Sequence, residues 1–211
     1  ALTAVAESMH AYLENCIGSE NGESLLDRYN RLAAEAEPGA DGFTLELFKQ
    51  PYEQMKEQVN AIEPRNIARA LMEGIVFLTR NRIETLSRLT GKPAGRIVLT
   101  GGPTKSPVWP TIIADVLNHP VAIPETGQHA GAMGAVLLAG MGAGVYRDEH
   151  DGYARIKSTD RIIEPDPERS ELYQTLYRDY VERYGLDDQS DAPSVARPRP
   201  GASAEQGGAA R

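Results

Sequence analysis

A glycine pair, Gly101-Gly102, follows a short apolar run and precedes a serine at position 106. Glycine accepts a positive φ and has no side chain, so the backbone there can approach a ligand that any Cβ would hold away. Ser106 is a favourable N-cap, and Pro107 a favourable first residue of a helix. A helix N-terminus carries about half a positive charge and unbonded N–H groups. The spacing therefore predicts an anion site, most naturally for a phosphate, beside Gly102 and Ser106.

A structural alternative stays open, because Gly-Gly also closes strand-to-helix turns in α/β proteins that bind nothing there. Lys105 could reach a phosphate as a point charge or simply be solvated. Trp109 is expected to be buried scaffold rather than a stacking platform for a base. The four histidines have no metal-ligand spacing with one another or with Cys16, the single cysteine, so the sequence predicts neither a metal site nor an internal disulfide. His129 is the histidine whose loop faces the carboxyl end of the expected sheet, where α/β folds place ligands.

The elements that position the glycine pair are a strand before it and a helix after it. The apolar residues 97–99 predict a strand buried on both faces. Pro110 predicts a tightened or kinked first turn in the following helix. Upstream, Asn66 is expected to cap a long helix that ends at Gly91. Arg69 and Glu73 lie four residues apart on that helix, where a surface pair is worth on the order of a few tenths of a kcal/mol.

The remaining segments are predicted from periodicity and composition. The tyrosines of the last helix are expected to lie on its packing side, and the residues beyond Leu186, rich in small and polar types, are expected to form a disordered tail. Residues 40–63 are compatible with a short strand or a short helix. Further expectations are helices over 1–15 and 23–36, a closely packed small-residue segment over 131–142, an extended linker over 148–163, and packed Tyr173, Tyr177 and Tyr180.

The order of these residues resembles the C-terminal domain of the FGGY carbohydrate kinases, the family of xylulokinase, gluconokinase and glycerol kinase. One departure is Gln128-His129, which stands where the family usually has an acidic residue, in a loop with one extra residue. The residues that resemble the family's elements, in the family's order, are Ala68 to Ile75, Gly101-Gly102, Ser106, Trp109, Ala114-Asp115-Val116, Pro120-Val121, Pro124-Glu125, Ala132-Met133-Gly134-Ala135, Gly142-Ala143-Gly144 and Glu164 to Pro167.

The resemblance implies an α/β fold, namely a ribonuclease H-like (actin-like ATPase) domain, here incomplete and with extra helices. Residues 1–186 would form the nucleotide-side domain without its first strands, and residues 187–211 the disordered tail. It implies ATP and Mg²⁺ as cofactors and nucleotide contacts from Gly101, Gly102, Pro103 and Ser106. No catalytic residue is assigned, because the family's phosphate loop and catalytic aspartate belong in or near an N-terminal domain upstream of this chain. The chain alone is therefore expected to be inactive.

The expected partners are that missing N-terminal kinase domain and a sugar. A ketopentose is favoured, because residues 96–146 resemble xylulokinase-like enzymes most. A homodimer is compatible with the sequence. The net charge of −8 argues against nucleic-acid and anionic-membrane binding, and without a signal peptide or a run of about eighteen apolar residues we expect a cytoplasmic protein.

Three other classes of protein compete with a kinase. A truncated nucleotide-binding or regulatory module that performs no chemistry is the main alternative. A Rossmann-like dinucleotide binder would need G-x-G-x-x-G where this chain has Gly-Gly-Pro, and a Walker-type ATPase would need a P-loop that the sequence lacks.

Overall fold

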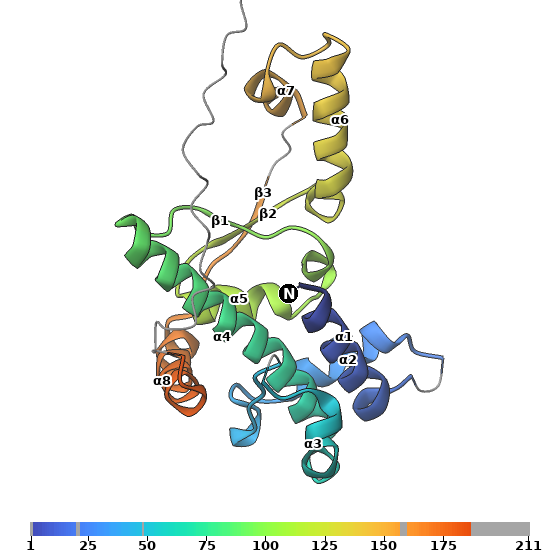
Figure 1. Cartoon of the computed structure of the whole chain (residues 1–211), viewed down its shortest axis with the longest axis vertical. Coiled ribbons are helices and arrows are strands. Elements are labelled where there is room, and N and C mark those ends of the chain that lie inside the picture. Colours follow the sequence, from blue (N-terminus) through green and yellow to red (C-terminus); the bar gives the residue numbers. More distant parts are fainter. Residues whose placement is uncertain (1, 20–21, 48, 157–159, 187–211) are drawn as a thin grey trace, which may run out of the picture.

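The computed structural model describes residues 2–19, 22–47, 49–156 and 160–186. The expected tail over 187–211 lies outside these residues. Figure 1 shows a helical body below a small sheet, with two helices standing beyond the sheet. The main helices are α1 (Leu2–Tyr12), which continues into a π-helical turn (Leu13–Ile17), α2 (Leu25–Glu35), α3 (Tyr52–Val59), α4 (Pro64–Thr90), α5 (Trp109–Leu117), α6 (Ala130–Gly142), α7 (Glu149–Ile156) and α8 (Pro167–Tyr184).

The described sheet has three strands in the order β1 (Ile97–Val98), β2 (Val121–Pro124) and β3 (Asp160–Ile163). β1 and β2 run parallel, and β3 is antiparallel to β2, with Pro124 opposite Asp160. The expectation that the strand before the glycines is buried on both faces is wrong. β1 lies at the sheet edge, where the Val98 side chain is 46% exposed.

The helical body is built around α4, which packs against α2, α5 and α8. Gly91 ends α4 in the left-handed conformation at φ +66°, as the sequence predicts. The predicted start is wrong: the N-cap is Glu63, because Pro64 suits the first helical position and starts the helix before Asn66. The prediction for α8 is confirmed, since the side chains of its three packing tyrosines are buried: Tyr173, Tyr177 and Tyr180.

A buried polar cluster joins α4 to α8 and to the end of α2. Arg69 Nε donates to Glu73 Oε1 at 2.8 Å, and the Glu73 carboxylate also accepts from the Tyr173 hydroxyl at 2.7 Å and the Gly39 amide at 3.0 Å. Arg69 in turn donates to the Ala33 carbonyl at 3.1 Å. The predicted pair of Arg69 and Glu73 is therefore confirmed, but both charged side chains are buried, so the few tenths of a kcal/mol expected of an exposed pair does not apply. Removing one partner of such a pair costs about 3–5 kcal/mol because the other charge is left buried.

The segment between α2 and α4 takes the helical one of its two predicted alternatives. It contains a 3₁₀ turn (Ala40–Gly42) and α3, and none of its described residues is in a strand.

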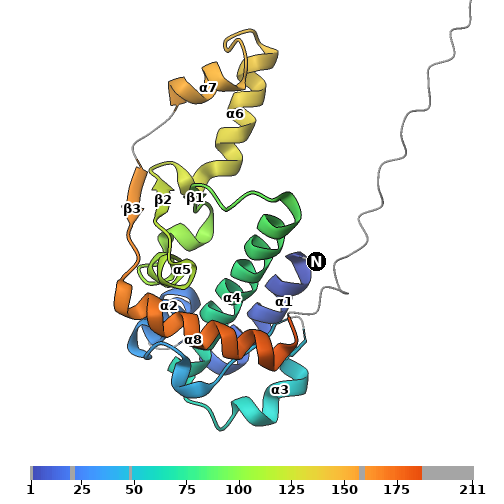
Figure 2. The same ribbon diagram turned by 90° about the vertical axis from the view of Figure 1, so that its left-hand side faces the viewer.

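Helices α6 and α7 stand apart from the body and pack mainly against each other (Figure 2). No residue of α6 is buried, and the Leu138 side chain is 69% exposed. The predicted close packing of the small residues holds only at Gly140, which lies against the Tyr146 ring, whereas Gly131 and Gly134 have open space where a Cβ would stand. None of the helices in the described ranges is long and apolar enough to span a membrane.

The predicted extended linker over 148–163 is wrong. Its residues form α7 and, after the undescribed residues 157–159, β3. The Asp148 carboxylate accepts from the Asp151 amide at 2.8 Å, and this contact satisfies an amide in the first turn of α7. A polar segment therefore becomes helical because its own side chain caps it.

Candidate functional site

The glycine turn follows β1 at the carboxyl end of the parallel strand pair. Gly101 has φ +81° and ψ −158°, a conformation that only glycine adopts readily. Its amide donates to the Gly127 carbonyl at 2.9 Å, and its carbonyl accepts from the Thr104 hydroxyl at 2.6 Å. These two bonds hold the turn closed. No described atom lies within 4 Å of the position where a Cβ would stand on Gly101 or Gly102, so the backbone there is open to a ligand.

The helix after the turn starts at Trp109, two residues later than the sequence predicts, and Pro107 precedes it. Ser106 Oγ nevertheless accepts from the Val108 amide at 3.3 Å and from the Trp109 amide at 3.0 Å. The amides of Thr111 and Ile112 both donate to the Val108 carbonyl, which is the tightened first turn that Pro110 predicts. The prediction of Ser106 as N-cap and Pro107 as first helical residue is therefore wrong: Val108 is the N-cap, and Ser106 binds the amides of Val108 and Trp109 from two residues before it.

The Ser106 side chain is buried and also contacts α2. Its hydroxyl donates to Asn30 Oδ1 at 2.6 Å. Beside it, the rings of Tyr29 and Trp109 meet edge to face, with centroids 6.3 Å apart. Trp109 is half-buried against the core, in agreement with its predicted scaffold role. Nothing near Asn30 in the sequence indicates this contact, because the two partners lie 76 residues apart.

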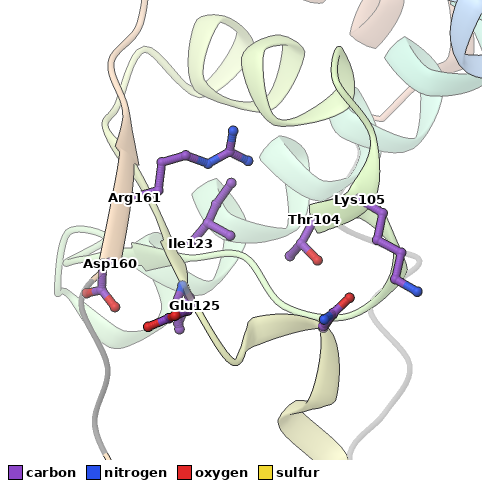
Figure 3. Close-up of a pocket in the computed structure, with 8 residues that line it drawn as sticks. Thr104, Lys105, Ile123, Glu125, Asp160 and Arg161 are labelled. Atoms are coloured by element: carbon purple, nitrogen blue, oxygen red, sulfur yellow. The ribbon is translucent and has the colours of Figure 1, made fainter.

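A pocket of about 530 Å³ lies beside the glycine turn, at the carboxyl end of β2 (Figure 3). Carboxyl ends of parallel strands are where open α/β sheets place their ligands. None of the four predicted nucleotide contacts lines the pocket, although Thr104 and Lys105 of its wall lie between Pro103 and Ser106 in the sequence. Its lining residues are Thr104, Lys105, Ile123, Pro124, Glu125, Gln128, Asp160 and Arg161.

Figure 3 shows Thr104 and Ile123 facing each other across the pocket, with Lys105 on one side and Arg161 on the other. Asp160 forms an ion pair with Arg96. Among the described residues, the side chains of Lys105 and Arg161 have no hydrogen-bond or ion-pair partner. The pocket therefore has two uncommitted cations, together with the carboxylates of Glu125 and Asp160, around an apolar floor, an arrangement that suits a polar ligand with an apolar part.

The fit of a metal ion can be tested on the same residues. In the described ranges, no three or more histidine, cysteine or carboxylate side chains are placed to hold a metal together. His129 lies exposed at the end of a 3₁₀ turn (Gly127–His129), and its neighbour Gln128 lines the pocket.

The sequence interpretation missed Asp160 and Arg161, because it assigned their segment to a linker. A signal was present in the apolar residues Ile162-Ile163 that follow, which are typical of a short strand.

Comparisons with known proteins agree with this architecture. Residues 20–143 match the model of the FGGY family of carbohydrate kinases, C-terminal domain. An autoinducer-2 kinase from Enterobacter sp. (strain 638) is 31% identical over 172 residues, which cover 72% of this chain and 32% of that protein. A ribulokinase from Mycolicibacterium smegmatis is 39% identical over 115 residues, which cover 54% of this chain and 20% of that protein. The chain thus spans about a third or less of the length of these relatives.

Two solved structures are similar in fold. A xylulose kinase from Rhodospirillum rubrum superposes with a TM-score of 0.63 at 28% identity, covering 88% of this chain and 38% of that one. Plasmodium falciparum glycerol kinase with ADP superposes with a TM-score of 0.57 at 15% identity, a likeness of fold alone, covering 85% and 37%. The chain therefore belongs to the FGGY family of carbohydrate kinases, and it has the actin-like fold of that family's C-terminal domain.

Proposed function

We propose that this chain is the nucleotide-binding side of an ATP-dependent carbohydrate kinase, which transfers the γ-phosphate of ATP to a hydroxyl of a sugar or polyol. The observation that carries the proposal is the open backbone at Gly101-Gly102, between the carboxyl end of a strand and a capped helix start. Backbone amides and a helix N-terminus at such a position favour phosphate. Family membership makes ATP the corresponding ligand.

The proposed contacts divide the nucleotide between the turn and the pocket. Gly101 and Gly102 let the adenosine and its first phosphate approach the backbone, and Pro103, which has no N–H, offers only a surface to adenine. Ser106 acts by fixing the loop between Pro103 and the start of α5, since it binds the amides of Val108 and Trp109. Lys105 is a flexible point charge within reach of the phosphates.

In the proposed reaction, the acceptor hydroxyl oxygen bonds to the γ-phosphorus while the bond from that phosphorus to the bridging oxygen of ADP breaks. The hydroxyl proton goes to a base outside this chain. Phosphoryl transfer depends chiefly on positioning and charge stabilisation, so a domain that orients ATP contributes without a catalytic side chain. Mg²⁺ would neutralise the phosphate oxygens when bound. We therefore expect the isolated chain to bind nucleotide without turnover.

The remaining partners of the proposal are the N-terminal kinase domain and the acceptor, in the cytoplasm. Within the described ranges, the outer edge of β1 is unpaired and the apolar helix α6 is uncovered. Further kinase polypeptide would pack on these surfaces, since a helix apolar all round is normally buried. For the acceptor we favour a ketopentose. Relatives named ribulokinase and xylulose kinase support this class, and autoinducer-2 kinases make a different polyol-like acceptor the competing choice.

Calorimetric titration of this chain with ATP tests the nucleotide site. Gly102→Asp adds bulk and negative charge against the phosphate, and we expect it to weaken binding at least about tenfold, the effect of roughly 1.4 kcal/mol. Gly95→Asp is the matched control, because Gly95 is another exposed glycine with open space around it but lies before β1. Unchanged affinity in folded Gly102→Asp would reject the site.

ADP release tests the whole reaction. The full-length kinase, ATP, Mg²⁺ and a panel of pentuloses and other polyols should give sugar-dependent ADP, fastest with a ketopentose. Nucleotide binding without phosphoryl transfer to any sugar would favour the non-catalytic module.

A further inference from the structure

We infer that Asn30, on α2, is a positioning residue for the nucleotide turn: it accepts the Ser106 hydroxyl hydrogen and thereby fixes the orientation in which Ser106 holds the first amides of α5. The inference rests on the proposed function and goes beyond it, because Asn30 lies outside the loop and belongs to a different part of the chain.

The hydrogen bonds around Asn30 have defined directions. Its Nδ2 donates to the Leu26 carbonyl at 2.9 Å, so its Oδ1 faces Ser106 and can only accept. Ser106 Oγ therefore donates its single hydrogen to Asn30 at 2.6 Å. Both hydroxyl lone pairs are then left for the amides of Val108 and Trp109. The Leu26 carbonyl of α2 thus sets the orientation of Asn30, and Asn30 sets the orientation of the Ser106 hydroxyl that binds the start of α5.

The support that Asn30 provides is rigid because α2 is held firmly to the rest of the body. The buried Arg69 guanidinium on α4 binds the Ala33 carbonyl of α2. Tyr29, next to Asn30, is 1% exposed and packs edge-on against Trp109. Two adjacent residues of α2 therefore contact the two ends of the segment from Ser106 to Trp109. A loop that is ordered before a ligand arrives binds it more tightly than one that must first be ordered.

The alternative is that Asn30 merely stabilises the fold. A double-mutant cycle on ATP affinity separates the two roles. If Asn30 acts through the Ser106 hydroxyl, Asn30→Leu should weaken ATP binding about fivefold, the usual effect of one lost hydrogen bond. In a Ser106→Ala background the same substitution should have no further effect. Asn30→Ala serves as a second variant if the leucine prevents folding.

The matched control is Asn15→Leu. Asn15 makes the same type of bond, from Nδ2 to the carbonyl four residues earlier, at 2.7 Å, but it does not contact the loop. We expect its ATP affinity to equal that of the wild type. The amide resonances of Val108 and Trp109 should shift in Asn30→Leu and not in Asn15→Leu.

The outcomes are distinguishable. Wild-type ATP affinity in Asn30→Leu, or an equal loss with and without the Ser106 hydroxyl, would overturn the positioning role while leaving the nucleotide site intact. If the wild-type chain binds no ATP, the proposed function fails and the nucleotide part of this inference with it. Unmoved Val108 and Trp109 resonances in Asn30→Leu would then also overturn the hydrogen-bonded relay itself.

Discussion

Gly74 lies in the middle of α4, where alanine would ordinarily be the better residue. An exposed helical Gly→Ala substitution stabilises a helix by about 1 kcal/mol. Here a Cβ would lie well under 3.0 Å from the Leu45 carbonyl oxygen, inside any ordinary contact. That carbonyl is held in place, because it accepts the Tyr180 hydroxyl at 3.0 Å, and the same hydroxyl lies 3.6 Å from the position of the added Cβ.

The expected cost of Gly74→Ala follows from these contacts. Forcing an extra carbon into a packed core costs about 1–3 kcal/mol, and weakening a buried hydrogen bond costs about 1–3 kcal/mol more. After the gain in helix propensity, we expect a net loss of about 2 kcal/mol or more. For a domain of this size, that lowers Tm by roughly 4–8 °C.

Urea and thermal unfolding of purified variants measure this effect. Gly134→Ala is the matched control, because Gly134 is also a helix-interior glycine but has open space where the Cβ would stand. The control should be as stable as the wild type or more stable. Wild-type stability or better in Gly74→Ala would refute the close approach of α4 to Leu45.

Three further predictions concern the core and the surface. Tyr173→Phe removes the hydroxyl that bridges Glu73 and Arg69, and urea unfolding should show a loss of about 1–3 kcal/mol, whereas an unchanged midpoint would mean that the buried cluster is not intact in solution. Alkaline pH should destabilise the fold, because buried tyrosine hydroxyls have a pKa above the value of about 10 that they have in the unfolded chain. The stability that depends on them is complete below that unfolded value and is lost as the pH rises above it, so an unfolding free energy that stays constant from about pH 8 to 11 would contradict this. Burial raises the pKa of the hydroxyls concerned, which include those of Tyr12, Tyr29, Tyr173 and Tyr180. Leu138→Glu, at an exposed apolar position of α6, should reduce self-association in sedimentation velocity with Tm nearly unchanged, and a large fall in Tm would show that α6 packs on the body.

Local chemistry accounts for the parts of the fold that the sequence predicted well. Gly91 ends a helix because a left-handed residue is needed there, and the α8 tyrosines recur at helical spacing on one face. The errors arise where tertiary contacts decide. Whether the residues before the glycine pair are covered depends on which strands flank them, and β1 lies at an edge of the described sheet.

The candidate site divides in the same way. The turn at Gly101-Gly102 depends on neighbouring residues, so the sequence could predict it, whereas the helix start at Trp109 differs from the predicted start at Pro107. The contact from Asn30 and the pocket wall at Arg161 come from distant segments, brought in by the packing of α2 and by the pairing of β3 with β2. No local pattern specifies such contacts, because each depends on the folded arrangement of the whole domain.

The most direct test of the nucleotide site is titration of isotope-labelled protein with ADP, followed at single backbone amides. The account predicts saturable binding, with the largest shifts at the amides of Gly101, Gly102 and the start of α5. Saturation with the largest shifts on α7 or α8, or no shift in the glycine turn at saturating ADP, would contradict it.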